Sequence, residues 1–274
     1  MCNVAWHSLF YGMGSYSMNR SDLIDGDQFE ALARRLGLVY VETHDLTRRI
    51  EDIRRMGQVV ILSHNSDGCI VPPGTPTREY DFVWWSCPAN VIHWFGQNVD
   101  VNDARLTPIP IGLERVRWYP QLRKHEAMLN TPRAAERQLC YLNANTRIRV
   151  QREELYQRFE GQPWMTAERG QNGENFEHYA RQLASHKFVL CPDGNGLDTH
   201  RTWEVLYLGA FPIVQRHRFT EEFARWLPLV IVDDWGQVTP DFLETYYATF
   251  TWCEWRWEAL AIGYWERLIR SYLP

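Results

Sequence analysis

The sequence lacks three features that would each define a class of protein: a long apolar run, a closely spaced cysteine pair and an excess of basic charge. No window approaches the roughly 18 uninterrupted apolar residues of a membrane-spanning helix. The amino terminus has no basic start followed by an apolar stretch and a small-residue cleavage site, so no signal peptide is predicted. We therefore expect a cytoplasmic protein without a membrane span.

The cysteines are scattered, without a C-x-x-C pair or the rhythm of zinc ligands, which indicates free thiols in a reducing compartment. They are Cys2, Cys69, Cys87, Cys140, Cys191 and Cys253. The net charge of −5 gives no overall basic surface for nucleic acid. A local basic patch stays open, because arginines cluster at 48–55 and at 147–152.

Aromatic residues are abundant, with 13 Trp and 13 Tyr among 274 residues. Many of these must pack in a core, and an excess also suits the stacking of sugars or bases in a cleft. The length and the 45% hydrophobic content allow one large or two modest domains.

Short apolar runs alternate with amphipathic segments, which predicts an α/β fold with parallel sheets. The stretch 114–137 is polar and crosses between domains, so we place a boundary near Gln138, with domains at 1–138 and 139–274. A Trp-rich helix is expected at 251–273. Strands are expected at 3–6, 38–41, 59–62, 82–85, 91–95, 107–111, 139–142, 188–191, 211–214 and 229–232. Helices are expected at 27–36, at 46–56 and, after the segment 143–147, through 159.

The segment 187–214, KFVLCPDGNGLDTHRTWEVLYLGAFPIV, predicts a strand, a glycine loop, a helix and a second strand. Residues 193–196 are expected to turn with positive φ and to leave N–H groups for an anion at the start of the helix. Asp198, Arg201 and Glu204 follow at three-residue spacing on one helix face, near the carboxyl end of the preceding strand. Ligands of open α/β sheets bind at such ends.

This polar stripe has two interpretations. One is a solvated helix face with an Arg201–Glu204 ion pair, worth a few tenths of a kcal/mol. The other is a nucleotide site, because a guanidinium can neutralise a diphosphate and a carboxylate can accept two ribose hydroxyls. The neighbouring Gly-x-Gly turn favours the second interpretation.

The same segment resembles the donor-binding signature of exostosin-like glycosyltransferases: a strand, Cys-Pro, Gly-x-Gly, Asp, Arg-x-x-Glu, Leu-Gly and Pro-Ile-Val, in this order. The resemblance extends more weakly to 139–152, 97–98 and 110–112, and it leaves most of the first half unmatched. The absence of a membrane anchor departs from the luminal animal members, and points to a cytosolic enzyme or an excised catalytic domain.

The resemblance implies a GT-B fold, in which two Rossmann-like domains face each other across a cleft and a terminal helix returns to the first domain. It implies sugar transfer from a nucleotide donor, usually without a bound metal. Residues 1–138 would hold the acceptor and 139–274 the nucleoside-diphosphate sugar, which is a co-substrate rather than a cofactor. The donor-binding residues expected in the glycine loop and helix are Gly194, Asn195, Gly196, Asp198, Arg201 and Glu204.

A second polar loop, 143–152, follows the strand at 139–142. Its amides and guanidinium groups, with Asn145, Arg147 and Arg152 preferred, could neutralise the leaving diphosphate. The alternative is a polar interdomain loop whose arginines are solvated or paired with Glu153 and Glu154.

A base for the acceptor hydroxyl is expected from the first half, where the loop 63–68 contains His64 and Asp67. The alternative is a loop closed by Asx turns. His93 is a second candidate, for which a hydrogen-bonded core position is the competing interpretation. Gly12 and Gly14 form a weak Gly-x-Gly that is also typical of a simple turn.

Three classes of function follow. The first is a glycosyltransferase acting on a saccharide or on a nucleic-acid acceptor such as a modified DNA base, with its two domains closing on binding. The second, a metal-dependent hydrolase using His64, Asp67 and His93, lacks the usual ligand spacings. The third is a non-catalytic carbohydrate- or nucleotide-binding module.

Overall fold

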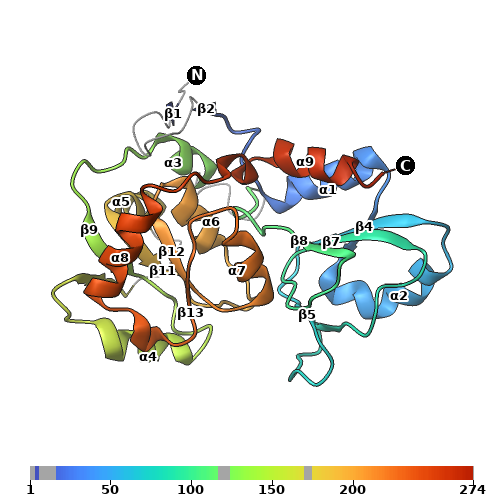
Figure 1. Ribbon diagram of the computed structural model, residues 1–274, viewed down its shortest axis with the longest axis horizontal. Helices are drawn as coiled ribbons and strands as arrows, with labels where there is room; N and C mark the ends of the chain where they lie inside the picture. The colour runs from blue at the N-terminus through green and yellow to red at the C-terminus, as the bar shows by residue number, and fades with distance from the viewer. Residues whose placement is uncertain (1–3, 6–16, 117–123, 170–174, 274) are drawn as a thin grey trace.

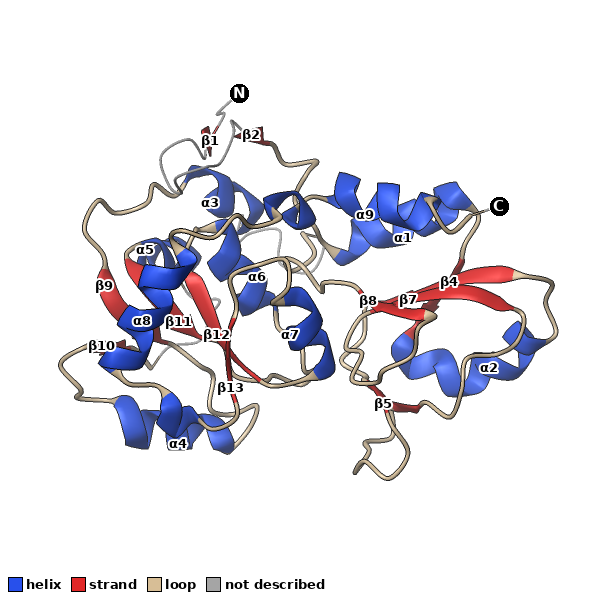
Figure 2. Cartoon of the chain, in the orientation of Figure 1, coloured by secondary structure: helices blue, strands red, loops and turns tan. Residues whose placement is uncertain are grey.

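The computed structural model describes residues 4–5, 17–116, 124–169 and 175–273, and these form an α/β protein with two parallel sheets flanked by helices (Figures 1 and 2). The first sheet has the order β3-β4-β7-β8 and the second the order β10-β9-β11-β12-β13. The strands of the first sheet are β3 (Val39–Glu42), β4 (Val59–His64), β7 (Val91–Gly96) and β8 (Leu106–Pro108). Those of the second are β9 (Gln138–Leu142), β10 (Met165–Ala167), β11 (His186–Leu190), β12 (Phe211–Gln215) and β13 (Val230–Val232). The Rossmann-like character predicted for both halves is thus present.

Two helices cover opposite faces of the first sheet, as Figure 1 shows: α1 (Gly26–Leu36) and α2 (Leu46–Arg54), the latter preceded by the 3₁₀ turn η2 (Thr43–Asp45). Helix α1 begins at Asp25, whose carboxylate accepts a hydrogen bond from the Gln28 N–H, and ends at Gly37, where φ is 69°. Its apolar face buries Phe29 and Leu32 against the sheet.

Two strands predicted for the first sheet lie outside it. The segment at 82–85 gives only β6 (Phe82–Val83), which pairs with β5 (Ile70–Val71) in a separate two-stranded sheet. The two strands run parallel, so the chain between them crosses over instead of forming a hairpin. At the amino terminus, β1 (Val4–Ala5) pairs antiparallel with β2 (Ser17–Met18), and Gly12 and Gly14 lie outside the described residues.

The second sheet reverses its direction of growth between β9 and β11. The chain passes from β9 through α4 (Gln151–Phe159) to β10 on one side, then through α5 (Phe176–Ala184) to β11 on the other side of β9. Helices α6 (His200–Tyr207) and α7 (Arg218–Phe223) lead on to β12 and β13. Such a reversal leaves a crevice between the loops that follow the two central strands, where open α/β sheets bind ligands.

The two halves are joined by α3 (Lys124–Asn130) and by the carboxyl-terminal segment, which contains η4 (Trp235–Gln237), α8 (Pro240–Phe250), η5 (Trp257–Leu260) and α9 (Ile262–Arg270). The single helix predicted at 251–273 is wrong, because Ala261 is extended and bridges to Leu23. Helix α9 contacts α1, as expected, and Arg35 pairs with Glu266 at 2.7 Å (Figure 1).

One hydrophobic core runs through both halves. It joins Phe29 and Leu62 of the first half to Tyr141, Phe188 and Trp203 of the second, and a smaller core lies around Trp94 under the first sheet. Cys69, Cys87, Cys140, Cys191 and Cys253 are free thiols, and Cys2 lies outside the described residues. Within the described part of the chain, no helix has the length and apolar character needed to cross a bilayer.

Candidate functional site

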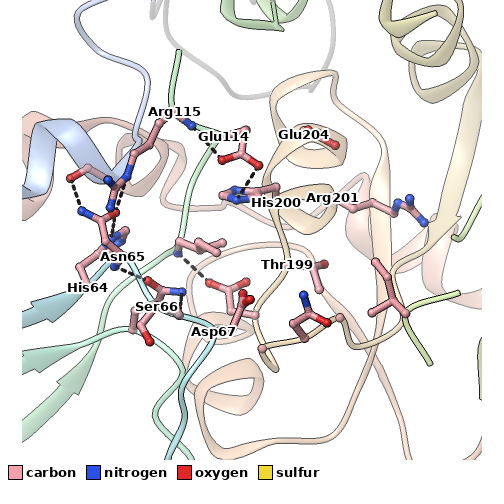
Figure 3. Close-up of a pocket in the computed structure, with 18 of the residues that line it drawn as sticks. His64, Asn65, Ser66, Asp67, Glu114, Arg115, Thr199, His200, Arg201 and Glu204 are labelled. Carbon is pink, nitrogen blue, oxygen red and sulfur yellow. Dashed lines mark hydrogen bonds and ion pairs between the residues drawn. The ribbon is translucent and has the colours of Figure 1, made fainter. Parts of the chain in front are cut away.

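A cavity of about 860 Å³ lies where the carboxyl ends of both sheets meet (Figure 3). Its size is in the range of small-molecule sites. The first half lines it with residues after β3, β4, β7 and β8, and the second half with the loops after β9 and β11, on either side of the reversal. The lining residues are Gly26, Glu42, His64, Asn65, Ser66, Asp67, Gln97, Ile111, Glu114, Arg115, Lys124, Asn145, Ile148, Arg152, Pro192, Gly194, Asn195, Gly196, Asp198, Thr199, His200, Arg201 and Glu204.

The cavity brings together all but one of the residues expected to bind the donor or, in the loop 63–68, to act as the base. The exception is Arg147, which is exposed and does not line the cavity. Its N–H donates to Asn145 Oδ1 at 3.0 Å, so the chain turns outward before α4 begins. The preferred pair of Arg147 and Arg152 is therefore not formed.

The glycine loop differs from the prediction in its backbone. None of residues 193–196 has a positive φ, and two N–H groups of the loop already have protein acceptors. Gly194 N–H donates to Gly196 O at 3.0 Å, and Asp198 N–H donates to Asn98 Oδ1 at 2.7 Å. Glycine is required at 196 for close approach, because a Cβ there would lie 2.6 Å from Asn98 Nδ2.

Asn98 holds the glycine loop from the first half. Its backbone is left-handed, with φ 54°. Its Nδ2 also donates to Ser66 O at 3.1 Å, so one amide ties the loop after β4 to the loop after β11. The floor of the cavity is thus built by both halves.

Arg201 and Glu204 form a buried group on α6 around Tyr179 of α5. Arg201 is 5% exposed and Glu204 4% exposed, so the solvated-face interpretation is wrong. Arg201 Nε donates to Tyr179 Oη at 3.2 Å, and this hydroxyl donates to Glu204 Oε2 at 3.0 Å. Among the described residues Arg201 Nη1 has no hydrogen-bond partner. Burial opposes its charge, but Tyr179 and Glu204 outweigh burial and raise the pKa of Arg201.

Arg152 fixes the two loops that flank the reversal of the sheet. Its Nε donates to Asp193 O at 2.9 Å, its Nη2 to Pro192 O at 3.2 Å and its Nη1 to Asn145 O at 3.3 Å. Burial, with help from the nearby Arg201 and Arg149, lowers its pKa to about 10, so Arg152 stays charged at neutral pH. The side chain adds positive charge to the cavity while its donors hold backbone.

Asp198 precedes α6 and joins the two halves. Its Oδ2 accepts a hydrogen bond from Ile111 N–H at 2.7 Å, and its Oδ1 accepts one from Trp203 Nε1 at 2.9 Å. Burial raises the pKa of Asp198 to about 7, against the effect of these hydrogen bonds. These bonds give the carboxylate a structural task in addition to its place in the cavity wall.

The two predicted bases differ in their surroundings. His64 is buried, with Nε2 3.0 Å from Pro110 O and Nδ1 3.0 Å from Asn65 Oδ1, and burial lowers its pKa to about 4. Asp67 is exposed at the cavity, and its carboxylate has no hydrogen-bond partner among the described residues. Neither side chain is both accessible and oriented by the protein.

His93 occupies a core position away from the cavity. Its Nε2 lies 2.8 Å from Thr107 Oγ1, and its ring lies 3.9 Å from that of Tyr272. Burial lowers its pKa to about 4. This confirms the competing interpretation of His93 as a hydrogen-bonded core histidine.

Several cavity residues escaped the sequence analysis, and His200 and Glu114 are two of them. His200 Nδ1 lies 2.8 Å from Gly112 O, and Nε2 lies 3.5 Å from Glu114 Oε2 (Figure 3). Both had a signal in the sequence: His200 directly precedes Arg201, and Glu114 closely follows the segment 110–112 to which the family resemblance extends.

The comparisons with known proteins assign no family. A scan against protein-family models and a search of curated proteins both found no match. Within the described part of the chain, no three His, Cys, Asp or Glu side chains cluster as metal ligands would. The chemistry of the cavity is therefore the basis for the function proposed below.

Proposed function

We propose that this protein is a GT-B-type glycosyltransferase, similar to the exostosin-like enzymes, that transfers a sugar from a nucleoside-diphosphate sugar to a hydroxyl acceptor. The second half holds the donor and the first half presents the acceptor. The acceptor is a saccharide or a hydroxyl on a nucleic-acid base.

The observation that carries the proposal is the buried guanidinium of Arg201, a cavity-lining residue whose Nη1 has no hydrogen-bond partner among the described residues. A buried charged donor without a partner is costly unless an anion completes it. Arg152 adds a second positive charge at the same wall. A diphosphate is an anion suited to such a site, because charge develops on it as the sugar leaves.

Glu204 supports the sugar-nucleotide part of the proposal. One carboxylate oxygen accepts from Tyr179, which fixes the side chain and leaves further lone pairs at the cavity. Vicinal hydroxyls of a ribose would supply the matching donors. The site also lies beside the reversal in strand order, where nucleotides bind in other open α/β sheets.

A ligand panel tests the proposal. Nucleoside diphosphates and nucleotide sugars are titrated against the wild type, Arg201→Ala and Arg147→Ala by thermal shift and calorimetry, without metal and then with magnesium or manganese. We expect one nucleotide to stabilise the wild type and Arg147→Ala, and to lose affinity for Arg201→Ala by about 100-fold. Arg147→Ala is the matched control, since it removes the same charge from the same region outside the cavity.

Each other outcome has a defined meaning. Equal binding by Arg201→Ala contradicts the donor site, provided that the variant unfolds cooperatively. If none of the nucleotides binds to or stabilises the wild type, the transferase proposal as a whole is contradicted. Binding without turnover supports a non-catalytic module instead, and salt-dependent DNA binding would identify a nucleic-acid acceptor.

A further inference from the structure

His200 and Glu114 form a polar pair at the junction of the two halves, on the side of the cavity that faces the first sheet. The histidine begins α6 in the second half, and the glutamate follows β8 in the first. The His200 side chain is 29% exposed and that of Glu114 is 22% exposed, so both are accessible from the cavity. Figure 3 shows His200 between Glu114 and the part of the wall that carries Arg201 and Glu204.

The contacts of His200 define which ring nitrogen is available. The oxygen of Gly112 can only accept, so Nδ1 must carry the hydrogen that bridges the 2.8 Å to it. In the neutral ring, Nε2 then has a lone pair, and it lies 3.5 Å from Glu114 Oε2. A hydroxyl in the cavity can donate its hydrogen to Nε2 while it stays close to this carboxylate.

The other carboxylates and imidazoles of the cavity are less suited to accept a proton from a ligand. His64 is fully buried between two protein oxygens. Asp198 is engaged by Ile111 and Trp203, and Glu204 by Tyr179. Asp67 and Glu42 lie at more exposed positions. The carboxylate of Asp67 has no hydrogen-bond partner among the described residues, and that of Glu42 lies 3.4 Å from His44 Nε2. Among the described residues that line the cavity, only His200 combines access, a defined tautomer and a neighbouring carboxylate.

We propose that His200 is the catalytic base of the transfer and that Glu114 is its positioning residue, an inference that rests on the proposed function. Nε2 takes the hydrogen of the acceptor hydroxyl as its O–H bond breaks. The acceptor oxygen bonds to the anomeric carbon, and the bond from this carbon to the diphosphate oxygen breaks. The electron pair leaves with the diphosphate towards Arg201, and Glu114 stabilises the charged imidazole. A single displacement of this kind inverts the anomeric configuration.

Two variants of His200 distinguish a catalytic base from a residue that only links the two halves through its hydrogen bond to Gly112 O. His200→Asn places an amide N–H near the position of Nδ1 and keeps a donor for Gly112 O, but it has no group at Nε2. His200→Ala loses both. If His200 is the base, both variants slow turnover by about 100-fold or more while donor affinity stays within about threefold. If it only joins the halves, His200→Asn keeps the wild-type rate and the melting temperature of His200→Ala falls.

The assay uses UDP-glucose, UDP-N-acetylglucosamine and GDP-mannose with water as the acceptor, and measures release of the nucleoside diphosphate against pH. The pH profile of the wild-type rate should contain a dependence that is absent from the residual rate of His200→Asn. Glu114 and the buried His64 are the titratable groups that act on His200 from the first half, and Arg201 and Glu204 follow it on α6. Glu114→Gln keeps the shape without the charge, so it should slow turnover by about tenfold and change the pH profile.

The outcomes distinguish this inference from the proposed function. Donor binding and wild-type turnover in His200→Asn overturn the role of His200 alone. No binding of any of the three nucleotides to the wild type contradicts the donor site for these nucleotides and removes the base with it. Binding to the wild type without release of diphosphate contradicts both the transfer and the base.

Discussion

The two walls of the cavity hold their polar groups in different ways. The second-half wall, comprising Asn145, Arg152, Gly194, Gly196, Arg201 and Glu204, has charged side chains buried and bonded to the protein. Arg201 is 5% exposed and Arg152 is 6% exposed. The first-half wall has the partly exposed carboxylates of Glu42, Asp67 and Glu114, and the Asp67 carboxylate has no hydrogen-bond partner among the described residues. It also has one buried guanidinium, that of Arg115, whose Nε donates to Asn65 Oδ1 at 2.8 Å.

This difference matches a division of tasks between donor and acceptor. Buried charges are tolerated only when their partners are fixed, so the second-half wall is organised before a ligand arrives. It presents guanidinium groups, which suit an anion. Apart from the buried Arg115, the first-half wall presents carboxylates that can accept hydrogen bonds from hydroxyl groups. Both sides of the cavity are therefore polar, and the more exposed carboxylates are on the first-half side.

The largest expected effect comes from Asp198, the buried acid that joins the two walls. Its folded pKa of about 7 lies above its value of 3.8 in an unfolded chain, so the folded state keeps the proton and wild-type stability falls as pH rises through this window. Asp198→Asn cannot ionise. Its stability relative to the wild type should therefore increase by about 3–4 kcal/mol between pH 4 and pH 7 and then level off. Chemical unfolding at a series of pH values measures this change.

An unchanged difference between Asp198→Asn and the wild type across that range would contradict the burial of the charge. His64 acts in the opposite direction in both proteins, because its folded pKa of about 4 lies below 6.5 and its contribution is lost as pH falls. The comparison between variant and wild type removes this shared contribution.

The next largest effect should come from Arg152, whose three nitrogens hold the loops of the second-half wall. Arg152→Ala removes donors from three carbonyl oxygens and should lower the free energy of unfolding by about 2–4 kcal/mol. Arg147→Ala, in the exposed part of the same loop, should change it by less than about 0.5 kcal/mol. Urea denaturation measures both. If both variants lose the same free energy of unfolding, the buried Arg152 does not stabilise the second-half wall more than the exposed Arg147 does.

A smaller effect is expected at the contact between the walls, where Gly196 meets Asn98. Gly196→Ala should cost about 1–3 kcal/mol because the new Cβ would lie 2.6 Å from Asn98 Nδ2. Adding Asn98→Gly removes that amide and suits the φ of 54°, so the combined loss should be smaller than the sum. Gly57→Ala has no heavy atom within 4 Å of its Cβ and serves as the control. If the stability losses of the two single variants add exactly in the double variant, the contact with Asn98 is not the reason that glycine occupies position 196.

Features that depend on residues close together in the sequence could be predicted. Short apolar runs such as 188–191 and 211–214 indicated buried parallel strands, and α6 placed Arg201 and Glu204 on one face because their spacing follows the helix. Tyr179, which bonds both side chains, was not predicted because it lies on α5 and only the tertiary fold brings it close. The domain boundary near Gln138 stays a prediction.

Other features depended on contacts that a sequence does not display. Gly194 and Gly196 were predicted to have positive φ, but neither does. In a sequence, a glycine needed for a left-handed backbone looks the same as one needed because a neighbouring group leaves no room for a Cβ. The His200–Glu114 pair joins two halves of the chain and was missed for the same reason. The strand predicted at 82–85 is present only at Phe82–Val83, and it pairs outside the main sheet because an apolar run does not specify its partner strand.

The most direct test of the account is calorimetric titration of the nucleotide that stabilises the wild type most with Glu204→Ala and Asp67→Ala. The two variants remove a carboxylate from opposite walls of one cavity. The account predicts that Glu204→Ala weakens binding by more than about tenfold while Asp67→Ala leaves it unchanged. Unchanged affinity in Glu204→Ala with a large loss of thermal stability, or a greater loss of affinity in Asp67→Ala, would contradict the assignment of the donor to the second-half wall.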